Sequence, residues 1–437
     1  MQTNVTAVLG QGFGDEGKGK IVDYLAKDYD IVVRFNGSLN AGHTIVVDGV
    51  KHVNRMLPCG LLHEHTKGVV AQGTMVNLQV LLEEINRLKL TKDRLFISDS
   101  AFIVLPIHKE IDIARETIGK DQKFIIGTTK NGIGPSFEDK VRRYGVRIHE
   151  LKDTSDLTRK LINITYAYWA QEKNYTGLSD LRNIEETVKS LVKELHEQYL
   201  QIEPYLTNTA LFLNNMIDYG ETVLLEAAQA TLLDLDFGTY PYVTSSNCTA
   251  GAICTGTGIP PKKITKIIGV TKAYVTRVGE GPFPTEIKDE AIVKQIRELG
   301  HEYGTVTKRP RRIGWLDIPM LNYACKINGI DELVMTKFDV LYDVKNVKVC
   351  LNYKDRSDNI ATPLEMKCAS PSYMEFNTQV NTIWTNRDST IDPYIQESCE
   401  KYITNISTFI NTPITMYSLG PERESLFHRR TTGSLIK

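Results

Sequence analysis

The segment from Gly10 to Lys20 has the residue types that hold nucleotide phosphates. It reads GQGFGDEGKGK and follows the apolar run VTAVL. Residues 12–18, GFGDEGK, match the first part of the phosphate-loop pattern GxxxxGK[ST], in which glycine amides and a lysine surround phosphate oxygens. Gly19 replaces the serine or threonine whose hydroxyl holds magnesium in that pattern. Asp15 lies inside the loop, and a carboxylate beside phosphates indicates a magnesium ion, a proton to be removed, or both. The alternative is a glycine-rich turn with solvated charges.

A second loop follows the next apolar run, DIVVRF. It reads RFNGSLNAGHT from Arg34 to Thr44, and its candidate functional residues are Asn40, Gly42 and His43. An isolated histidine is more often structural than catalytic. A position in a glycine-containing loop at a strand end favours a functional role, because ligands of α/β sheets bind at the carboxyl ends of the strands.

The tetrapeptide TKFD, residues 336–339, follows the strand-like run ELVMT and has the chemistry to recognise guanine. A carboxylate such as that of Asp339 accepts both the ring N1 proton and the exocyclic amine of guanine, a donor pair that adenine lacks on that edge. The stem of Lys337 can lie along the base, as in the related NKxD motif of GTP-binding proteins. The turn after PITMYS, at Leu419 and Gly420, is a weaker candidate for contacts to the other edge of the base.

The run GTVTKRPRRIGW, residues 304–315, concentrates four cationic side chains between two glycines. Arginine binds carboxylates and phosphates in bidentate fashion, so we expect a loop that closes on an acidic substrate. A nucleic-acid patch is the competing interpretation, which the absence of interleaved aromatic residues disfavours. Three further segments with abundant turn residues, 127–145, 226–247 and 276–286, are also predicted to be site loops.

The elements that must position these loops alternate between short apolar runs and longer amphipathic ones. This pattern predicts an α/β fold with a central, mostly parallel β-sheet flanked by helices. Strands are expected at 5–9, 30–35, 94–98, 123–127, 222–226, 266–270, 332–336, 347–351 and 413–418. Apolar spacing predicts helices around 78–88 and 181–195. We interpret 1–437 as a single domain with a P-loop-like GTP site and a helical excursion at approximately 153–205.

Composition excludes several classes of function. With 52 basic and 53 acidic residues and a net charge of -1, nothing marks the whole molecule as a nucleic-acid or membrane binder. The seven cysteines form no CxxC pair, which argues against a disulfide framework or a zinc site. The chain begins without a signal-like segment and contains no apolar window of about eighteen residues. A soluble, cytoplasmic protein is therefore expected.

Taken together, eight ordered motifs closely resemble the adenylosuccinate synthetase family, whose members join IMP and aspartate at the expense of GTP. These motifs are GQGFGDEGKGK, NAGHT, GTTKNGIGP, TYPYVTSSN, TRVGEGPFPTE, RPRRIGWLD, TKFDVL and SLGP, and they extend over essentially the whole chain. The resemblance implies a ligase of purine biosynthesis that forms AMP's precursor, with Mg²⁺ as cofactor and a homodimeric assembly. A regulatory GTP-binding switch remains the alternative, although Gly19 does not suit its magnesium scheme.

The resemblance also implies roles for individual residues. Catalytic roles fall to Asp15, His43, Lys18 and Gln229. Contacts to GTP fall to Gly14, Asp15, Glu16, Gly17, Lys18, Gly19, Lys20, Gly42, His43, Thr44, Arg311, Lys337, Phe338, Asp339, Ser418, Leu419 and Gly420. Contacts to IMP fall to Asp15, Glu16, Gly17, Lys18, Asn40, Ala41, Gly42, His43, Thr129, Arg143, Gln229, Thr244 and Arg309, with Arg143 contributed by the neighbouring subunit. Aspartate would be bound by Thr305, Val306, Thr307, Lys308, Arg309, Pro310 and Arg311, and the metal by Asp15 and Gly42.

In the implied reaction Asp15 removes the N1 proton of IMP, which makes the purine O6 nucleophilic toward the γ-phosphate of GTP. His43 acts as the acid that stabilises the transfer. The aspartate amine then displaces the phosphate from the 6-phosphoryl intermediate. Phosphoryl transfer depends mainly on positioning and charge neutralisation, which is what glycine amides, a lysine and a divalent cation supply.

Overall fold

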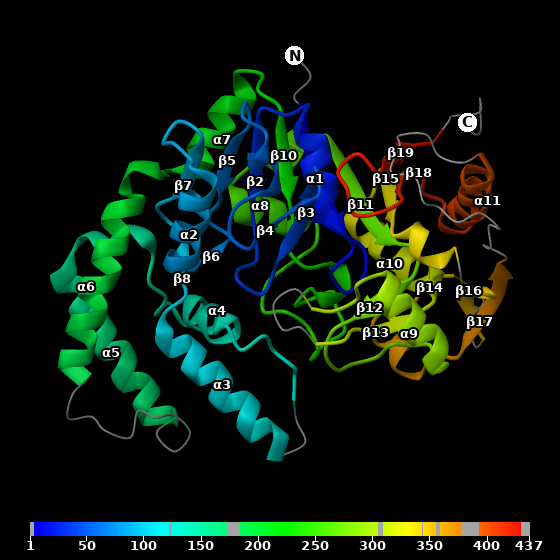
Figure 1. The fold of residues 1–437 in the computed structure, drawn as a ribbon. Helices are drawn as coiled ribbons and strands as arrows, with labels where there is room; N and C mark the ends of the chain where they lie inside the picture. Colours follow the sequence, from blue (N-terminus) through cyan, green and yellow to red (C-terminus); the bar gives the residue numbers. More distant parts are fainter. Residues whose placement is uncertain are drawn as a thin grey trace.

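The computed structural model describes residues 4–121, 125–172, 184–304, 309–342, 344–354, 359–376 and 393–429. Its central element is a ten-stranded sheet with the order β19-β18-β15-β11-β1-β10-β2-β5-β7-β9 (Figure 1). Its strands are β1 (Val5–Gly10), β2 (Ile31–Arg34), β5 (Lys67–Val70), β7 (Leu95–Ser98), β9 (Leu206–Thr207), β10 (Val223–Glu226), β11 (Lys266–Lys272), β15 (Glu332–Thr336), β18 (Ile414–Ser418) and β19 (Leu426–His428). Every neighbouring pair is parallel except β18 and β19, which confirms the predicted α/β class with a mostly parallel sheet.

Helices cover the sheet and extend beyond it. They are α1 (Lys18–Ala26), α2 (Leu78–Leu88), α3 (Pro106–Asp121), α4 (Ile133–Arg142), α5 (Thr154–Glu172), α6 (Ile184–Ile202), α7 (Thr209–Asp218), α8 (Gly251–Thr257), α9 (Glu290–Leu299), α10 (Ile318–Asn328) and α11 (Pro393–Ile410). None of the helices within the described residues has both the length and the apolar character needed to cross a membrane.

The smaller sheets lie around the central one. They are formed by β3 (His43–Val47) with β4 (Val50–Asn54), β6 (Met75–Val76) with β8 (Phe102–Ile103), β12 (Val275–Arg277) with β13 (Arg312–Gly314), and β14 (Leu316–Asp317) with β16 (Val347–Tyr353) and β17 (Pro371–Phe376).

Both faces of the sheet are buried, and this explains the continuous apolar runs of its strands. Along β1, Val8 packs with Ile21 of α1, whereas Leu9 belongs to the opposite core, which contains Leu213 of α7 and Ile253 of α8. Successive side chains of a strand point to opposite faces, so a strand covered on both sides is apolar throughout.

Most predicted strands are found within a residue or two of their expected bounds, and one prediction needs correction. The run KFIIG was expected to be a strand at 123–127, but its described residues, 125–127, are irregular, and Ile126 is 37% exposed. The run VKVCL forms a strand as predicted, β16, which pairs with β14 and β17 in a sheet separate from the central one. Conversely, β5 is a strand of the central sheet that the sequence analysis does not predict.

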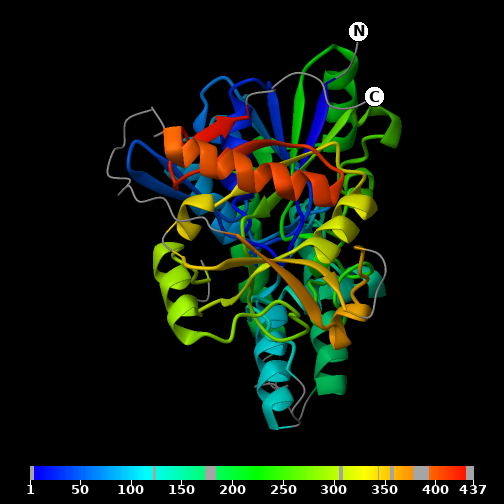
Figure 2. The ribbon, with the colours of Figure 1, turned by 90° about the vertical axis from the view of Figure 1, so that its right-hand side faces the viewer.

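The helical hairpin of α5 and α6 lies at one side of the molecule, opposite the sheet that contains β16 and β17 (Figure 1). Seen from the side, α3 and the α5–α6 pair extend away from the layer that contains the central sheet (Figure 2). Buried apolar side chains of α6 join the same core as those of α2.

The parallel sheet places the predicted site loops together. The segments that follow β1, β2, β10, β11, β15 and β18 all leave from the carboxyl edge of the sheet, which is the lower edge in Figure 1. These segments contain the two glycine loops, the EAAQ segment, TKFD and the SLG turn. A ligand crevice at this edge is typical of open α/β sheets.

Candidate active site

The loop after β1 is wrapped around the carboxylate of Glu16. Its Oε1 accepts hydrogen bonds from the amides of Gly12 at 3.2 Å and Gly14 at 2.8 Å. Its Oε2 lies 2.6 Å from Nζ of Lys18, and both side chains are almost completely buried. Two backbone amides and a lysine are the donors that the sequence predicts for a phosphate. The loop is thus already shaped to surround an anion.

Close packing explains why residue 19 is glycine and not the serine or threonine of the phosphate-loop pattern. A Cβ at Gly19 would lie 2.9 Å from Cβ of His43 and 3.2 Å from Sγ of Cys59. Serine or threonine would collide there unless the second loop moved. Because Gly19 has no side chain, His43 packs directly against the start of α1, where the amides of a helix N-terminus favour anions.

The imidazole of His43 contacts the buried ion pair of Glu226 and Arg34. Its Nδ1 is hydrogen bonded to Oε1 of Glu226, which also accepts from Nη1 of Arg34 at 2.9 Å. The other oxygen, Oε2, accepts from the amide of Cys59 at 2.7 Å. Burial favours the neutral acid, but His43, Arg34 and this amide outweigh it and lower the pKa of Glu226 to about 2. The carboxylate is therefore ionised and fixes the Nδ1–H tautomer of the imidazole.

Burial and the neighbouring guanidinium of Arg34 lower the pKa of His43, despite the opposing effect of Glu226. Both of these effects favour the neutral imidazole. In the described part of the chain, His43, Cys59 and Glu226 form a group whose possible ligand atoms lie within 4.8 Å of one another. The hydrogen bonds among them and the adjacent guanidinium do not favour a cation at this point.

Asp15 has a left-handed backbone conformation, with φ of 62°, and a side chain that is 34% exposed. Its Oδ2 lies 2.8 Å from Nε of Arg311, whose own side chain is buried. The pair is electrostatic, because Nε makes no aligned hydrogen bond within the described residues. The carboxylate at the phosphate loop is therefore partly exposed and faces a cation.

The TKFD segment follows β15 and presents a polar atom that lacks a partner. Among the residues that the structure describes, Oδ1 of Asp339 is buried and has no hydrogen-bond partner. Burial raises the pKa of this carboxyl group, against the lowering effects of the Gly420 amide and Lys337. The Lys337 ammonium donates to the carbonyl of Gly300 at 2.5 Å and to Glu302 at 3.0 Å. The ammonium group of Lys337 is thus fixed, and the aliphatic part of its side chain can lie along a base.

The first loop, TKFD and the SLG turn are tied to one another. Oγ1 of Thr336 donates to the carbonyl of Glu16 at 2.6 Å. Nζ of Lys20 donates to Oγ of Ser418 at 2.7 Å and to the carbonyl of Gly420 at 2.9 Å. Lys20 therefore stands beside the predicted base-binding turn, and burial lowers its pKa to about 7. Phe338 and Leu419 are fully buried beneath these loops.

The predicted IMP residues meet between the second loop and the segment after β10. Nδ2 of Asn40 donates to Oγ1 of Thr244 at 3.1 Å, and its Oδ1 is buried without a partner in the described residues. Gln229 has a φ of 55°, and neither polar atom of its amide has a partner within the same part of the chain. Buried amides usually make hydrogen bonds, so these atoms indicate a ligand contact. Thr129, after α3, accepts a hydrogen bond from Nδ2 of Asn131 at 3.1 Å.

Some predicted residues lie elsewhere or outside the described residues. Thr305, Val306, Thr307 and Lys308 of the aspartate loop lie outside them. The flanking chain forms a narrow hairpin, in which the Gly304 amide donates to the Arg309 carbonyl at 2.9 Å and Tyr303 pairs with Pro310.

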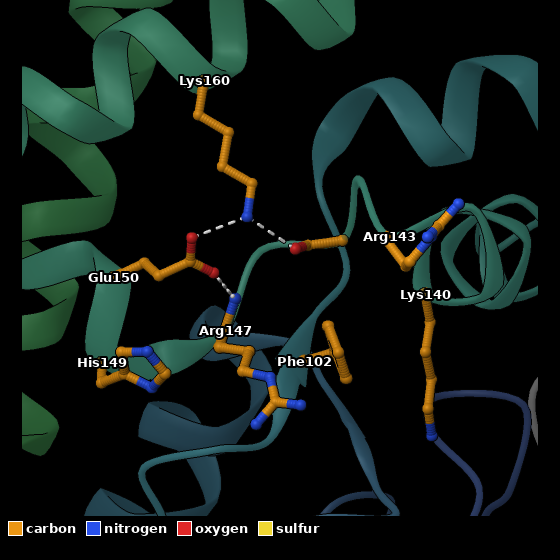
Figure 3. A pocket seen from close by; sticks show the side chains of 8 residues that line it. Phe102, Lys140, Arg143, Arg147, His149, Glu150 and Lys160 are labelled. Atoms are coloured by element: carbon orange, nitrogen blue, oxygen red, sulfur yellow. Dashed lines mark hydrogen bonds and ion pairs between the residues drawn. The ribbon is translucent and has the colours of Figure 1, made fainter.

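Arg143 caps α4 and lines a separate open pocket of about 520 Å³. Figure 3 shows Arg143 and Lys140 on one side of this pocket, with the Lys160–Glu150 ion pair on the other. The residues that line this pocket include no other predicted site residue.

Several charged residues beneath the site were not predicted from the sequence. Glu226 and Arg34 are the last residues of β10 and β2 and are direct neighbours in the register of these strands. Glu302 lies under the guanine segment and contacts Lys337 and Arg311. The sequence does contain a signal for the first pair, because VLLE and IVVR each end an apolar strand with a single charged residue. A charged side chain at such a position is buried only when it has a partner, so two such strands indicate a buried ion pair.

A family model described as adenylosuccinate synthetase matches residues 7–427. The chain belongs to the adenylosuccinate synthetase family. It is 42% identical over 431 residues to an adenylosuccinate synthetase of Chlorobium phaeobacteroides, covering 98% of each chain, and 42% identical over 426 residues to that of Hydrogenobaculum sp., covering 96% of this chain and 99% of the relative. The structure of the fully ligated adenylosuccinate synthetase from Plasmodium falciparum superposes with a TM-score of 0.87 at 38% identity, covering 98% of this chain and all of that one.

Family members are ligases of purine biosynthesis, so the chain is an enzyme of this class. The comparisons give no support to the alternative of a regulatory GTP-binding switch.

Proposed function

We propose that this chain joins IMP and L-aspartate to adenylosuccinate, with GTP converted to GDP and phosphate. The observation that carries the proposal is the hydrogen bond from Thr336 Oγ1 to the Glu16 carbonyl. It joins a segment with guanine-binding chemistry to a loop with phosphate-binding chemistry at one sheet edge. Family membership supplies the reaction class.

In the first step Asp15 takes the N1 proton of IMP, and the resulting purine O6 attacks the γ-phosphate of GTP. The bond between the γ-phosphorus and the oxygen that bridges it to the β-phosphate breaks, and GDP leaves. Lys18 and the amides of the first loop bind the phosphate oxygens, and Lys18 then exchanges its contact with Glu16 for one with phosphate. In the second step the aspartate amine attacks C6, the C6–O bond breaks, and phosphate leaves with the proton that the amine loses. The amide of Gln229, which has no hydrogen-bond partner within the described residues, orients the purine.

His43 acts as the acid in the first step. In the free protein its Nδ1 is hydrogen bonded to Glu226, and burial together with the Arg34 guanidinium lowers its pKa, which favours an Nε2 without a proton. The negative charge of bound phosphates raises the pKa of the imidazole, so the ring gains a proton at Nε2. That proton stabilises the charge that develops as the phosphoryl group moves to O6, a contribution of about a hundred- to ten-thousandfold in rate.

The donor set at the mouth of the site suits Mg²⁺. The Asp15 carboxylate is partly exposed and already carries a cationic partner, Arg311, which a metal ion would replace or join. Asp15 and the backbone oxygen of Gly42 would hold the ion, since carboxylate and carbonyl oxygens are the ligands that Mg²⁺ prefers. When bound, Mg²⁺ supplies charge neutralisation for the transferred phosphoryl group.

The remaining contacts follow the arrangement of the loops. In this proposal Asp339 reads guanine N1 and N2 through its unpaired oxygen, and Ser418 to Gly420 contact the other edge of the base. Residues 14–20 and 42–44 contact the GTP phosphates. Contacts to IMP come from residues 15–18 and 40–43 and from Thr129, Gln229, Thr244 and Arg309, and contacts to aspartate come from residues 305–311.

The proposal includes a homodimer, a cytoplasmic location and one domain spanning 1–437. Arg143 lines a pocket that contains no other predicted site residue among those the structure describes, which supports its contribution to the site of a second subunit. Exposed apolar residues beside it, Val141 and Tyr144, suit a covered surface. The continuous core that α6 shares with α2 supports a single domain.

A coupled assay for adenylosuccinate tests the function. Product is expected with GTP, IMP and aspartate together, little product when ATP replaces GTP, and none when IMP or aspartate is omitted. Phosphate release from GTP that is unaffected by IMP and aspartate would contradict the proposal. Asp15→Ala and His43→Ala are expected to fold and bind GTP without turnover, and near-normal turnover in either variant would remove that residue's assigned role.

A further inference from the structure

The buried carboxylate of Glu302 connects two parts of the site that contact different substrates in the proposed function. Glu302 follows α9 and precedes β13 in the chain, and its side chain is completely buried. Oε1 accepts from the Lys337 ammonium at 3.0 Å, and Oε2 accepts from Nη1 of Arg311 at 2.5 Å. Lys337 belongs to the guanine segment, whereas Arg311 belongs to the cationic loop. A single carboxylate thus holds one side chain from each.

The central sheet determines where this carboxylate lies. Lys272, the last residue of β11, donates to its two oxygens at 3.0 and 3.1 Å, and the hydroxyl of Tyr274 donates to Oε1 at 2.6 Å. Lys272 is also fixed by a hydrogen bond of 2.6 Å to Oγ1 of Thr276. Since β11 pairs directly with β15, which ends before Lys337, the anchor and the guanine segment belong to one rigid element.

The link continues from Glu302 to the phosphate loop. The backbone amide of Arg311 donates to the carbonyl of Glu302 at 3.0 Å, so main chain and side chain of Arg311 are both held by this residue. Nε of Arg311 then lies 2.8 Å from Oδ2 of Asp15. An unbroken series of contacts therefore runs from Lys337 through Glu302 and Arg311 to Asp15.

Electrostatics make this carboxylate hard to replace. Three cations, those of Lys272, Arg311 and Lys337, contact it, and without it they would repel one another in a region with little water. Burial opposes ionisation of Glu302, but the three cations outweigh burial and hold its pKa well below the usual value. Burial also lowers the pKa of Lys272 to about 8, so that ammonium depends on its anionic partner.

We propose that Glu302 is a positioning residue that fixes Arg311 relative to Lys337, and thereby makes guanine binding and binding of the dicarboxylate substrate depend on each other. The inference rests on the proposed function, which assigns guanine to the Lys337 segment and aspartate to the loop of Arg311, a residue for which the family resemblance implies a GTP contact as well. Glu302 itself contacts neither substrate. If Glu302 couples the two sites, a substitution in the guanine segment, such as one at Lys337, must change the KM for aspartate.

The first measurement is steady-state kinetics of Glu302→Gln with each substrate varied in turn. An amide offers one acceptor oxygen where the carboxylate offers two, so the contact with either Arg311 or Lys337 is lost. We expect the KM for GTP and for aspartate to rise about tenfold each, with the KM for IMP and kcat changed by less than about threefold. Tyr274→Phe removes one hydrogen bond to Glu302 without changing any charge, and it should produce the same pattern at about threefold.

The second measurement is a double-mutant cycle with Lys337→Met. The Lys337 side chain does not belong to the aspartate loop, so its effect on the KM for aspartate has to pass through Glu302. We expect Lys337→Met to raise this KM about three- to tenfold in the wild-type background and by less than about twofold in the Glu302→Gln background. Equal effects in the two backgrounds would overturn the proposal, and so would an equal rise of all three KM values in Glu302→Gln.

Matched controls are available in buried residues outside this network. Asp317→Asn changes another fully buried carboxylate, and Tyr402→Phe removes another buried hydroxyl, which donates to the Ala273 carbonyl at 3.0 Å. Both should leave the three KM values unchanged.

A wild-type chain that forms no adenylosuccinate overturns the proposed function, and the coupling with it. An active wild type with an additive cycle overturns the coupling alone. If Glu302→Gln does not fold, Tyr274→Phe takes its place in the double-mutant cycle with Lys337→Met, and the same outcomes support or overturn the proposal.

Discussion

Nδ1 of His43 is hydrogen bonded to Oε1 of Glu226, and this contact leaves Nε2 as the imidazole nitrogen available to a ligand. The carboxylate is buried at the end of β10 and ionised, so it both orients the ring and stabilises the imidazolium that the proposed acid role requires.

Replacing Glu226 by glutamine is expected to lower kcat about a hundredfold or more, with changes of less than about threefold in the KM for GTP and IMP. The amide cannot accept from His43, Arg34 and the Cys59 amide at once, and it stabilises no imidazolium. Cys59→Ala is the control, because it keeps the backbone donor and removes only the thiol contact of 3.2 Å. Initial rates across pH 6 to 9 check the result, and a variant with wild-type kcat would contradict the role of Glu226.

Gly19→Ser restores the phosphate-loop pattern and is nevertheless expected to impair the enzyme. The new Cβ would meet the Cβ of His43 at 2.9 Å, so either the second loop or the start of α1 must shift. Displacement of a catalytic group by about 1 Å can cost on the order of a hundredfold in rate. We expect kcat to fall at least tenfold, as measured in the adenylosuccinate assay. Activity equal to or above wild type would show that this contact is unimportant.

Asp339→Asn should change the base preference of the nucleotide triphosphate. The carboxylate accepts two donors from guanine, and losing charge-assisted hydrogen bonds of this kind reduces kcat/KM for GTP by about a hundredfold. Xanthine has a carbonyl where guanine has the exocyclic amine, so an amide at residue 339 can donate to it. The GTP/XTP ratio of kcat/KM should therefore reverse in favour of XTP, with the KM for IMP unchanged. An unaltered ratio would place the guanine contact elsewhere.

The proposed dimer predicts complementation between two inactive variants. If Arg143 serves the partner's site, an Asp15→Asn chain mixed with an Arg143→Ala chain forms heterodimers in which one site has both groups intact. An equimolar mixture should then recover about a quarter of the wild-type activity, because half of the dimers are mixed and each has one complete site. Mixed samples are assayed after subunit exchange, with separately assayed variants as controls. No recovery despite demonstrated exchange would assign Arg143 to its own subunit or to no site.

The sequence identifies loops well and the charged groups beneath them poorly. Asp15 and Asp339 are predictable because each lies in a short motif whose chemistry is local. Glu226 and Arg34 are not, because their pairing arises from the register of β10 with β2, strands separated by nearly two hundred residues in the chain. The roles proposed for these side chains remain predictions, whereas their proximity is a property of the fold.

Strand predictions show the same division. The buried strands β1 and β15 are recognisable from their apolar runs, since both of their faces are covered. The run KFIIG has comparable composition, yet residues 125–127 are irregular, and the Gly127 amide is directed at the carboxylate of Glu116 at 3.3 Å. Local propensity does not determine whether a neighbouring strand exists.

Asp317 should make the free energy of unfolding depend on pH. Burial raises its pKa to about 7, despite hydrogen bonds from the Met320 amide at 3.1 Å and the Tyr353 hydroxyl at 2.9 Å, which act in the opposite direction. Between about pH 4 and pH 7 the folded state therefore keeps a proton that the unfolded state has released. The contribution of this group to stability accordingly falls as the pH rises through this range, by on the order of 1.4 kcal/mol per unit.

Asp317→Asn retains an acceptor for the first turn of α10 and cannot titrate. Urea unfolding of both proteins at four pH values between 4.5 and 7.5 measures the effect. The stability of the wild type relative to the variant should decrease steadily over this interval and become constant above about pH 8. Two curves that stay parallel from pH 4.5 to 7.5 would show that the folded carboxyl group has an ordinary pKa, and hence that it is better solvated than its complete burial at the start of α10 indicates.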